Sequence, residues 1–227
     1  MALILHLETA TTNCSVALSE GTRLLCKKEL NNGYTHNENL NLFIEEVLKQ
    51  SEKEFAHLDA VSVSVGPGSY TGLRIGVSAA KGLAYALDVP VIGVETLDAF
   101  SQNEQVKTFE GYRIPMLDAR RMEVYSAVFN QEAKIRSTQA EVIDGSSFDS
   151  FNEKVLLYGP GADKLEELFS GDCNIQIEKG LVPTAVDLIK PALEKYRNQD
   201  FEDTAYFEPF YLKNFIAGKP KQLIRRN

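Results

Sequence analysis

The chain has 227 residues, of which 44% are hydrophobic, so it can fold as one large domain or two small ones around a proper core. Its net charge of −8 and sequence pI of about 5.0 exclude a protein that grips nucleic acid alone through a broad basic face. No window approaches the roughly 18 apolar residues of a membrane span, and three cysteines without paired metal spacing indicate free thiols in a reducing compartment. We therefore expect a soluble, cytoplasmic protein.

Strands and helices alternate along the first half of the chain. Three buried-looking runs separated by turn residues predict a meander, and apolar residues at helical spacing predict the helix that follows it. The expected elements, in chain order, are strands over 3–7, 14–18 and 23–29, a helix over 40–48, a strand over 60–65, a helix over 71–87 and a strand over 89–94.

A glycine-rich turn, Gly66-Pro67-Gly68-Ser69, joins the strand over 60–65 to the helix over 71–87. Gly66 and Gly68 allow positive φ or a close backbone approach, and Ser69 or Thr71 can cap the helix. The spacing excludes a Walker phosphate loop, because Leu73 and not a lysine directly follows Gly72, and it excludes a dinucleotide fingerprint. Two interpretations stay open: a helix N-terminus that receives an anion or a partner's carboxylate, and a tight turn without a ligand.

The same helix carries a ridge with almost no side chains. Gly72, Gly76, Ala80 and Ala84 recur every four residues, so a neighbouring helix can approach this ridge closely. In a water-soluble protein such a ridge usually packs inside the chain. The alternative is a helix-to-helix interface between subunits.

The second half of the chain begins as the first half does. Residues 114–120 resemble residues 4–10 at a shift of 110, and residues 125–128 resemble residues 14–17 at a shift of 111. A duplicated unit explains this pattern, and chance similarity of two hydrophobic hairpins is the alternative. The remaining expected features are a hinge over 101–110, a strand over 155–158, a Gly159-Pro160-Gly161 turn, a helix over 165–169 and a helix over 186–196, whose start carries Thr184 and Asp187 in capping-box spacing.

Each half places a carboxylate where its first strand ends, Glu8 in one and Asp118 in the other. Two tandem units of this kind are the plan of the actin-like, sugar-kinase-like folds (the ribonuclease H-like or ASKHA class), in which a nucleotide and a metal sit between the lobes. We expect an α/β fold of two such lobes with mixed sheets flanked by helices, the first over 1–104 with a partner-binding helix and the second, reduced, over 105–227 with a C-terminal tail. A vestigial or working nucleotide cleft would be formed by Glu8, Asp118, Gly66, Gly68 and Ser69.

Several motifs together closely resemble the TsaB (YeaZ) family. They are Glu8-Thr9-Ala10-Thr11 with Cys14-Ser15-Val16-Ala17-Leu18, then His36, then the glycine block from Gly66 to Gly76, and Asp118-Ala119-Arg120-Arg121-x-Glu123-Val124-Tyr125. The likeness is strong up to about residue 130 and loose after that, through Pro209-x-Tyr211-Leu212. Glu8 replaces the aspartate more usual at this position, so any metal contact by it is less secure.

The resemblance implies a bacterial protein needed to make N6-threonylcarbamoyladenosine (t6A) beside the tRNA anticodon. It also implies partnership with TsaD, a paralogue that holds the catalytic metal, and with TsaE, a P-loop ATPase. Where TsaD carries a His-x-x-x-His metal pair, this chain has Thr96 and Phe100, which cannot act as imidazole ligands for iron or zinc. His36, just before a helix, is expected to cap or pack rather than to ligate.

We therefore predict a partner subunit without catalysis of its own and without a tightly bound cofactor. ATP, magnesium and the transition metal would lie on the partner subunits, and tRNA would be reached through the complex. The family also dimerises and pairs with TsaD through the N-terminal lobe, which favours the interface interpretation of the ridge. The expected interface residues are Gly72, Leu73, Arg74, Gly76, Val77, Ala80, Lys81 and Ala84, with Arg74 and Lys81 as rim charges.

Two other classes of function stay open. An independent enzyme, a nucleotide-dependent kinase or hydrolase, would use Glu8 and Asp118 on a magnesium ion between the lobes. A peptidase would need a nucleophile with its base, and no such set is recognisable from spacing. A scaffold for some other cytoplasmic partner would need neither carboxylate.

Overall fold

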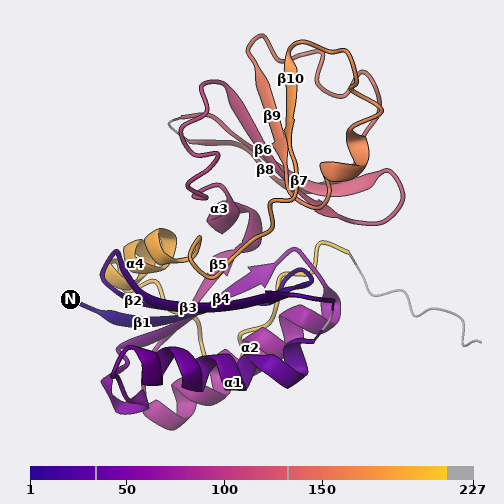
Figure 1. Cartoon of the computed structure of the whole chain (residues 1–227). Coiled ribbons are helices and arrows are strands. Elements are labelled where there is room, and N and C mark those ends of the chain that lie inside the picture. The colour runs from indigo at the N-terminus through magenta and orange to yellow at the C-terminus, as the bar shows by residue number, and fades with distance from the viewer. Residues whose placement is uncertain (34, 132, 214–227) are drawn as a thin grey trace, which may run out of the picture.

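The computed structural model describes residues 1–33, 35–131 and 133–213 and shows two lobes, each built on a five-stranded mixed sheet (Figure 1). In the first sheet the strand order is β3-β2-β1-β4-β5, and in the second it is β10-β9-β6-β7-β8. The end of the expected C-terminal tail, 214–227, lies outside the described residues.

The first lobe follows the predicted element order. The buried run Leu3-Ile4-Leu5-His6-Leu7 before Glu8 makes its central strand, and the two long helices of the lobe cover one face of the sheet through an apolar core that includes Leu5, Ile44 and Val77. Its elements are β1 (Leu3–Glu8), β2 (Asn13–Glu20), β3 (Arg23–Asn31), α1 (His36–Gln50), a 3₁₀ turn (Phe55–His57), β4 (Ala60–Gly66), α2 (Tyr70–Leu87), β5 (Val91–Glu95) and α3 (Thr96–Phe100). Strands β1, β4 and β5 are parallel, and β2 runs antiparallel to β1.

The second sheet repeats the topology of the first. Strand β6 is antiparallel to β7 and parallel to β9, just as β1 is antiparallel to β2 and parallel to β4. Its elements are β6 (Tyr112–Asp118), β7 (Glu123–Phe129), β8 (Lys134–Val142), β9 (Val155–Tyr158), a 3₁₀ turn (Asp163–Leu165) and β10 (Ile175–Glu178), before helix α4 (Ile189–Arg197). Read outward from the central strand, the two orders are identical, so the internal duplication predicted from the sequence is confirmed.

The second lobe is reduced because turns replace its helices. The helix expected over 165–169 is wrong: in the described chain only the 3₁₀ turn and further turns occupy this region. Aromatic side chains from these turns cover the sheet, with the Phe148 ring 5.4 Å from that of Phe169 and 6.1 Å from that of Phe151. Apolar spacing alone predicted a helix here, but three rings bury the sheet without one. Strands β8 and β10 were not predicted.

The chain returns to the first lobe after β10. Leu188 and the α4 residues Ala192 and Leu193 are buried against Ile4 and Ile92 of the first sheet. Residues 200–211, which we call the C-terminal strap, follow: Glu202 N donates to the Val91 carbonyl (2.9 Å) and Phe210 N to that of Val65 (2.7 Å). The division at residues 104 and 105 stays a prediction, but part of the expected second lobe packs on the first.

The small-residue ridge of α2 faces the interior of the chain. Gly72, Gly76, Ala80 and Ala84 are all buried, and a methyl group on either glycine would overlap with oxygen atoms of Thr9. The predicted interface through this ridge is therefore corrected: β1 and the turn after it, not a partner helix, approach the ridge. Leu73 and Val77, two more of the expected interface residues, are buried as well.

Two glycines of the same helix provide a test of this packing. Gly72→Ala adds a methyl group against the Thr9 carbonyl and should lower the free energy of unfolding by roughly 2 kcal/mol or more. Gly82→Ala meets no atom within 4 Å and should raise it by roughly 0.5–1 kcal/mol through helix propensity. Urea denaturation measures both, and equal effects of the two substitutions would contradict the packing.

Candidate functional site

The carboxylate of Glu8 lies in the interior at the junction of the two lobes. It is fully buried, its Oε1 accepts a hydrogen bond from the Ala10 N–H at 2.6 Å, and its Oε2 has no hydrogen-bond partner among the described residues. Burial, with a smaller contribution from the charge of Asp187, raises the pKa of Glu8 from its ordinary value of 4.5 to about 7, while the hydrogen bond from the Ala10 N–H opposes the rise. Glu8 therefore holds its proton far more readily than an exposed glutamate.

Asp187 is the second buried carboxylate at the junction, and its position was not predicted as part of a site. Its Oδ2 accepts from the Thr184 N–H (2.9 Å) and hydroxyl (3.2 Å), and its Oδ1 accepts from Asn103 Nδ2 (3.1 Å). Burial raises the pKa of Asp187 to about 7. The capping-box spacing did place Thr184 and Asp187 together, but in the turn before α4 rather than at its first residue.

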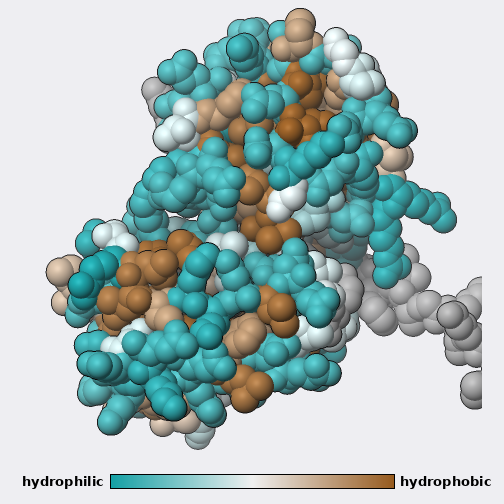
Figure 2. Space-filling view, in the orientation of Figure 1, coloured by the Kyte–Doolittle hydropathy of each residue, from teal (hydrophilic) through white to brown (hydrophobic). Residues whose placement is uncertain are grey.

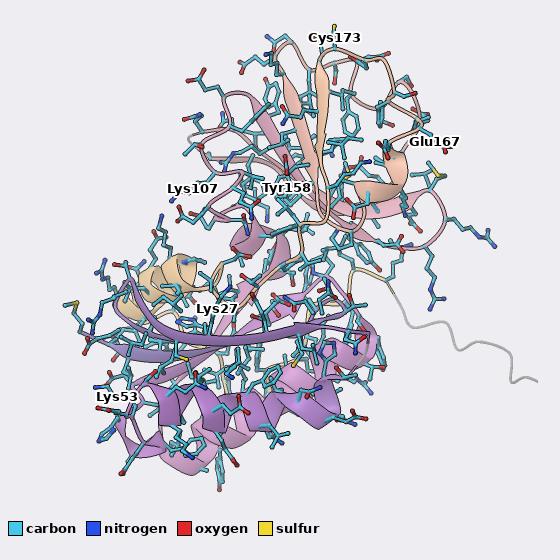
Figure 3. The ribbon with its side chains drawn as sticks, in the orientation of Figure 1. Lys27, Lys53, Lys107, Tyr158, Glu167 and Cys173 are labelled. Atoms are coloured by element: carbon cyan, nitrogen blue, oxygen red, sulfur yellow. The ribbon has the colours of Figure 1, made fainter. Side chains whose placement is uncertain are left out.

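Residues 183–187 close the junction from the second half of the chain. Asn13 Nδ2 donates to the Pro183 carbonyl at 3.0 Å, and the Ala185 N–H donates to Ser15 Oγ at 3.0 Å. Hydrophobic residues continue from the middle of the second lobe down to this junction (Figure 2). Figure 3 places Tyr158 at the base of the second lobe, and its ring lies 5.0 Å from that of Phe100.

Asp118, the carboxylate that corresponds to Glu8 in the second lobe, lies at the surface. Its side chain is 52% exposed, forms an ion pair with Lys164, and accepts a hydrogen bond from the Arg120 N–H at 3.0 Å. The structure does not bring Glu8 and Asp118 into a common magnesium site, because one is sealed in the interior and the other is held outward by a lysine.

The glycine-rich turn packs against the residues that follow β1. Ser69 N donates to the Ala10 carbonyl (2.7 Å), and Ser69 Oγ accepts from the Gly72 N–H (3.3 Å), which is the predicted cap. A methyl group on Gly68 would overlap with Ala10, and one on Gly66, whose φ is +120°, with the Phe210 carbonyl. The chain itself thus accounts for both glycines.

Thr96 and Phe100, the two positions at which the resemblance implies a metal pair in TsaD, lie in the core. Thr96 and Phe100 on α3 are fully buried, and the described residues contain no group of three or more His, Cys, Asp and Glu side chains able to hold a metal. His36, the first residue of α1, is also buried, with Nε2 2.8 Å from the Thr11 carbonyl. In the described chain no helix is long and apolar enough to cross a membrane.

Helix α2 exposes a face opposite its buried ridge. Thr71, Arg74, Ser78, Gly82 and Tyr85 lie on this face, and the side chain of Tyr85 is 85% exposed. On the neighbouring helix α1, Leu42 is 55% exposed. Arg74 and Lys81, which were expected as charged residues at the rim of an interface, instead form hydrogen bonds with the C-terminal strap.

The strap contacts are direct. Lys81 Nζ donates to the carbonyls of Phe207 (2.9 Å) and Ala205 (3.2 Å). Arg74 Nε donates to the Tyr211 hydroxyl at 3.1 Å, and its guanidinium stacks 4.3 Å from the centre of the Tyr70 ring. Lys81 is thus occupied within the chain, whereas Arg74 lies at the edge of the exposed face.

The model of the family described as TsaD, tRNA N6-adenosine threonylcarbamoyltransferase, matches residues 32–206. The chain belongs to the TsaD family. Within it, full-length likeness is to TsaB proteins: 29% identity to the tRNA threonylcarbamoyladenosine biosynthesis protein TsaB of Escherichia coli (95% of this chain and 96% of that protein) and 28% to that of Haemophilus influenzae (95% of each). The resemblance to TsaB (YeaZ) found in the sequence is thereby confirmed.

Solved structures agree on the fold. YeaZ from Pseudomonas aeruginosa is similar with a TM-score of 0.81 at 25% identity, over 93% of this chain and all of that one. A polyphosphate/ATP-glucomannokinase from Arthrobacter, at 12% identity over 87% of this chain and all of that one, has a TM-score of 0.50 and shows likeness of fold alone. The expected two-lobed actin-like fold is confirmed.

The pKa of Glu8 gives a prediction for stability against pH. Because the folded state holds the proton more tightly than the unfolded state, Glu8 costs stability progressively as pH rises from 4.5 to about 7. Glu8→Gln should match the original chain near pH 4.5 and exceed its free energy of unfolding by roughly 3 kcal/mol at pH 8.

Urea denaturation at pH 4.5, 6 and 8 measures the difference in free energy of unfolding between Glu8→Gln and the original chain. The histidines titrate in both chains, so their contribution cancels in this difference. Glu45→Gln, on the exposed side of α1, serves as the control and should show little difference at any of the three. A difference for Glu8→Gln that does not grow with pH would rule out a protonated glutamate at the junction.

Proposed function

We propose that this chain is a non-catalytic subunit of the bacterial complex that makes t6A in tRNA. The single observation that carries the proposal is its full-length likeness to curated TsaB proteins named for t6A biosynthesis. In this proposal it pairs with a TsaD-like paralogue, a TsaE-like P-loop ATPase joins them, and tRNA is bound through the complex. ATP, magnesium and a transition metal then belong to the partner subunits.

The junction supports a subunit that does no chemistry of its own. The carboxylate that ends β1 is sealed from solvent and shares its surroundings with Asp187, so it does not face a reactant. The two positions after β5 where the paralogue carries imidazoles are a threonine and a phenylalanine in the core. The frame of the transferase is kept while its reactive groups are absent from these positions.

The exposed face of α2 is the surface that we assign to the partner. Gly82 is the central residue of this face, and no atom of the chain lies within 4 Å of where its Cβ would be. A glycine in a helix interior costs roughly 1 kcal/mol relative to alanine, and nothing inside this chain requires it. Close approach of a partner helix to Ser78, Gly82 and Ala86 would explain this glycine, with the exposed Tyr85 as an anchor on the same helix. The same face would serve a homodimer when the chain is alone.

Three arginine substitutions test this assignment. Gly82→Arg should stay folded but lose pairing with itself and with the TsaD-like partner, because a long charged side chain keeps the helices apart. Gly145→Arg, at an equally open glycine of the second lobe, is the matched control and should pair normally. Ala80→Arg should unfold, since Ala80 is fully buried. Light scattering, thermal melting and a pull-down with the tagged partner report the outcomes.

Normal pairing by Gly82→Arg would place the interface elsewhere. If the Ala80→Arg chain stays folded and loses only its pairing, the interface is formed by the ridge of Gly72, Gly76, Ala80 and Ala84 after all.

The absence of chemistry in this subunit is tested in the reconstituted complex. With Glu8→Gln, t6A formation should stay within about threefold of the original rate, a change of about 0.7 kcal/mol in the barrier. A hundredfold loss with assembly intact, measured by incorporation of labelled threonine into tRNA, would make Glu8 a catalytic residue.

A further inference from the structure

The turn between β6 and β7 holds two arginines in a strained backbone conformation. Arg120 has φ of 77° and Arg121 has φ of 53°, the left-handed region that Asn and Gly adopt most readily. The conformation is fixed by hydrogen bonds from Glu123 N to the Arg120 carbonyl (3.1 Å) and from Ala119 N to the Glu123 carbonyl (3.1 Å). We call residues 119–122 the hairpin tip. An Asn-Gly pair would form such a tip with less strain, so the fold does not explain the arginines.

The hairpin tip is a positive site on an acidic protein. Both arginines are exposed, and within the described residues neither guanidinium has an ion pair or a hydrogen bond. The two carboxylates at the base of the tip are already paired, Asp118 with Lys164 and Glu123 with Lys213. Four cations therefore surround two anions, in a chain whose net charge is −8.

A further cation lies at the base of the same hairpin. Lys213 pairs with Glu123, and its Nζ lies 5.9 Å from the centre of the Tyr125 ring. The described contact thus adds the charge of Lys213 to that of the two arginines of the hairpin tip.

We propose that Arg120 and Arg121, with Lys213 beside them, form a contact for the phosphate backbone of RNA. Guanidinium groups form paired hydrogen bonds to phosphate oxygens, and a tip fixed by its backbone presents two of them without further ordering. This inference rests on the proposed function for the kind of RNA, a tRNA, and adds that this subunit touches it directly. The contact reads charge and not sequence, so it adds affinity without selecting the tRNA.

The test measures binding of a fluorescent, unmodified tRNA transcript to the full chain, alone and with the TsaD-like partner. The variant Arg120→Asn/Arg121→Gly relieves the strain and removes both charges. We expect it to melt a few degrees higher, to bind tRNA about tenfold more weakly at low salt, and to lower the slope of log Kd against log salt by about one to two. Arg120→Lys/Arg121→Lys, which keeps both charges, should stay within about threefold of the original affinity.

The matched control removes two charges from the first lobe. Lys49→Gln/Lys53→Gln neutralises lysines at and after the end of α1, and Figure 3 places Lys53 in the first lobe, away from the second sheet. Unchanged affinity in the control supports the proposal, and unchanged affinity of Arg120→Asn/Arg121→Gly, both alone and with the partner, overturns it. Normal tRNA binding combined with lost capture of the partner would make the tip a protein contact, which also overturns it. Failure of the original chain to pair with a TsaD-like protein, with arginine-dependent RNA binding intact, would refute the proposed function and leave this contact standing.

Discussion

The contact between helix α2 and the turn after β1 determines how the first lobe is arranged. Thr9 Oγ1 donates to the Gly72 carbonyl at 2.8 Å, Ser69 N donates to the Ala10 carbonyl at 2.7 Å, and neither Gly72 nor Gly76 has room for a side chain there. Because the backbones meet directly, the rotation of α2 about its axis is fixed. One ridge is committed to the interior, and the face with Ser78, Gly82 and Tyr85 is left exposed.

The same turn determines the surroundings of the Glu8 carboxyl group. It directs the Ala10 N–H back to the Glu8 carboxylate, and residues 183–187 then close over it from the other half of the chain. In an actin-like fold the end of the first strand faces the space between the lobes, where a reactant would lie. Here that position holds a buried carboxyl group whose pKa is raised to about 7, which fits the proposed subunit that leaves the reaction to a paralogue.

Much of this fold follows from the sequence because its signals are local. The apolar run of β1, the helical spacing of Leu40 and Ile44, and the serine cap at Ser69 each act over a few residues, and the structure has all three. The repeated opening of the two halves predicted the duplication, which the shared strand order confirms. The sequence does not predict whether the ridge of Gly72 and Ala80 faces the interior or a partner, because small residues every four positions are compatible with both.

Other features depend on contacts between distant parts of the chain. Asp187 lies near enough to affect the pKa of Glu8 only because the segment before α4 returns to the first lobe, and no local pattern encodes that return. The strained Arg120 and Arg121 are likewise invisible in the sequence, because arginine is common in ordinary turns. Backbone dihedral angles and burial distinguish these residues from their neighbours.

A crystal structure of this chain with its TsaD-like partner tests the central claim most directly. The account predicts that a partner helix crosses α2 over Ser78, Gly82 and Ala86 at an interaxial distance of roughly 8 Å or less. A complex in which this face of α2 stays exposed to solvent would contradict it.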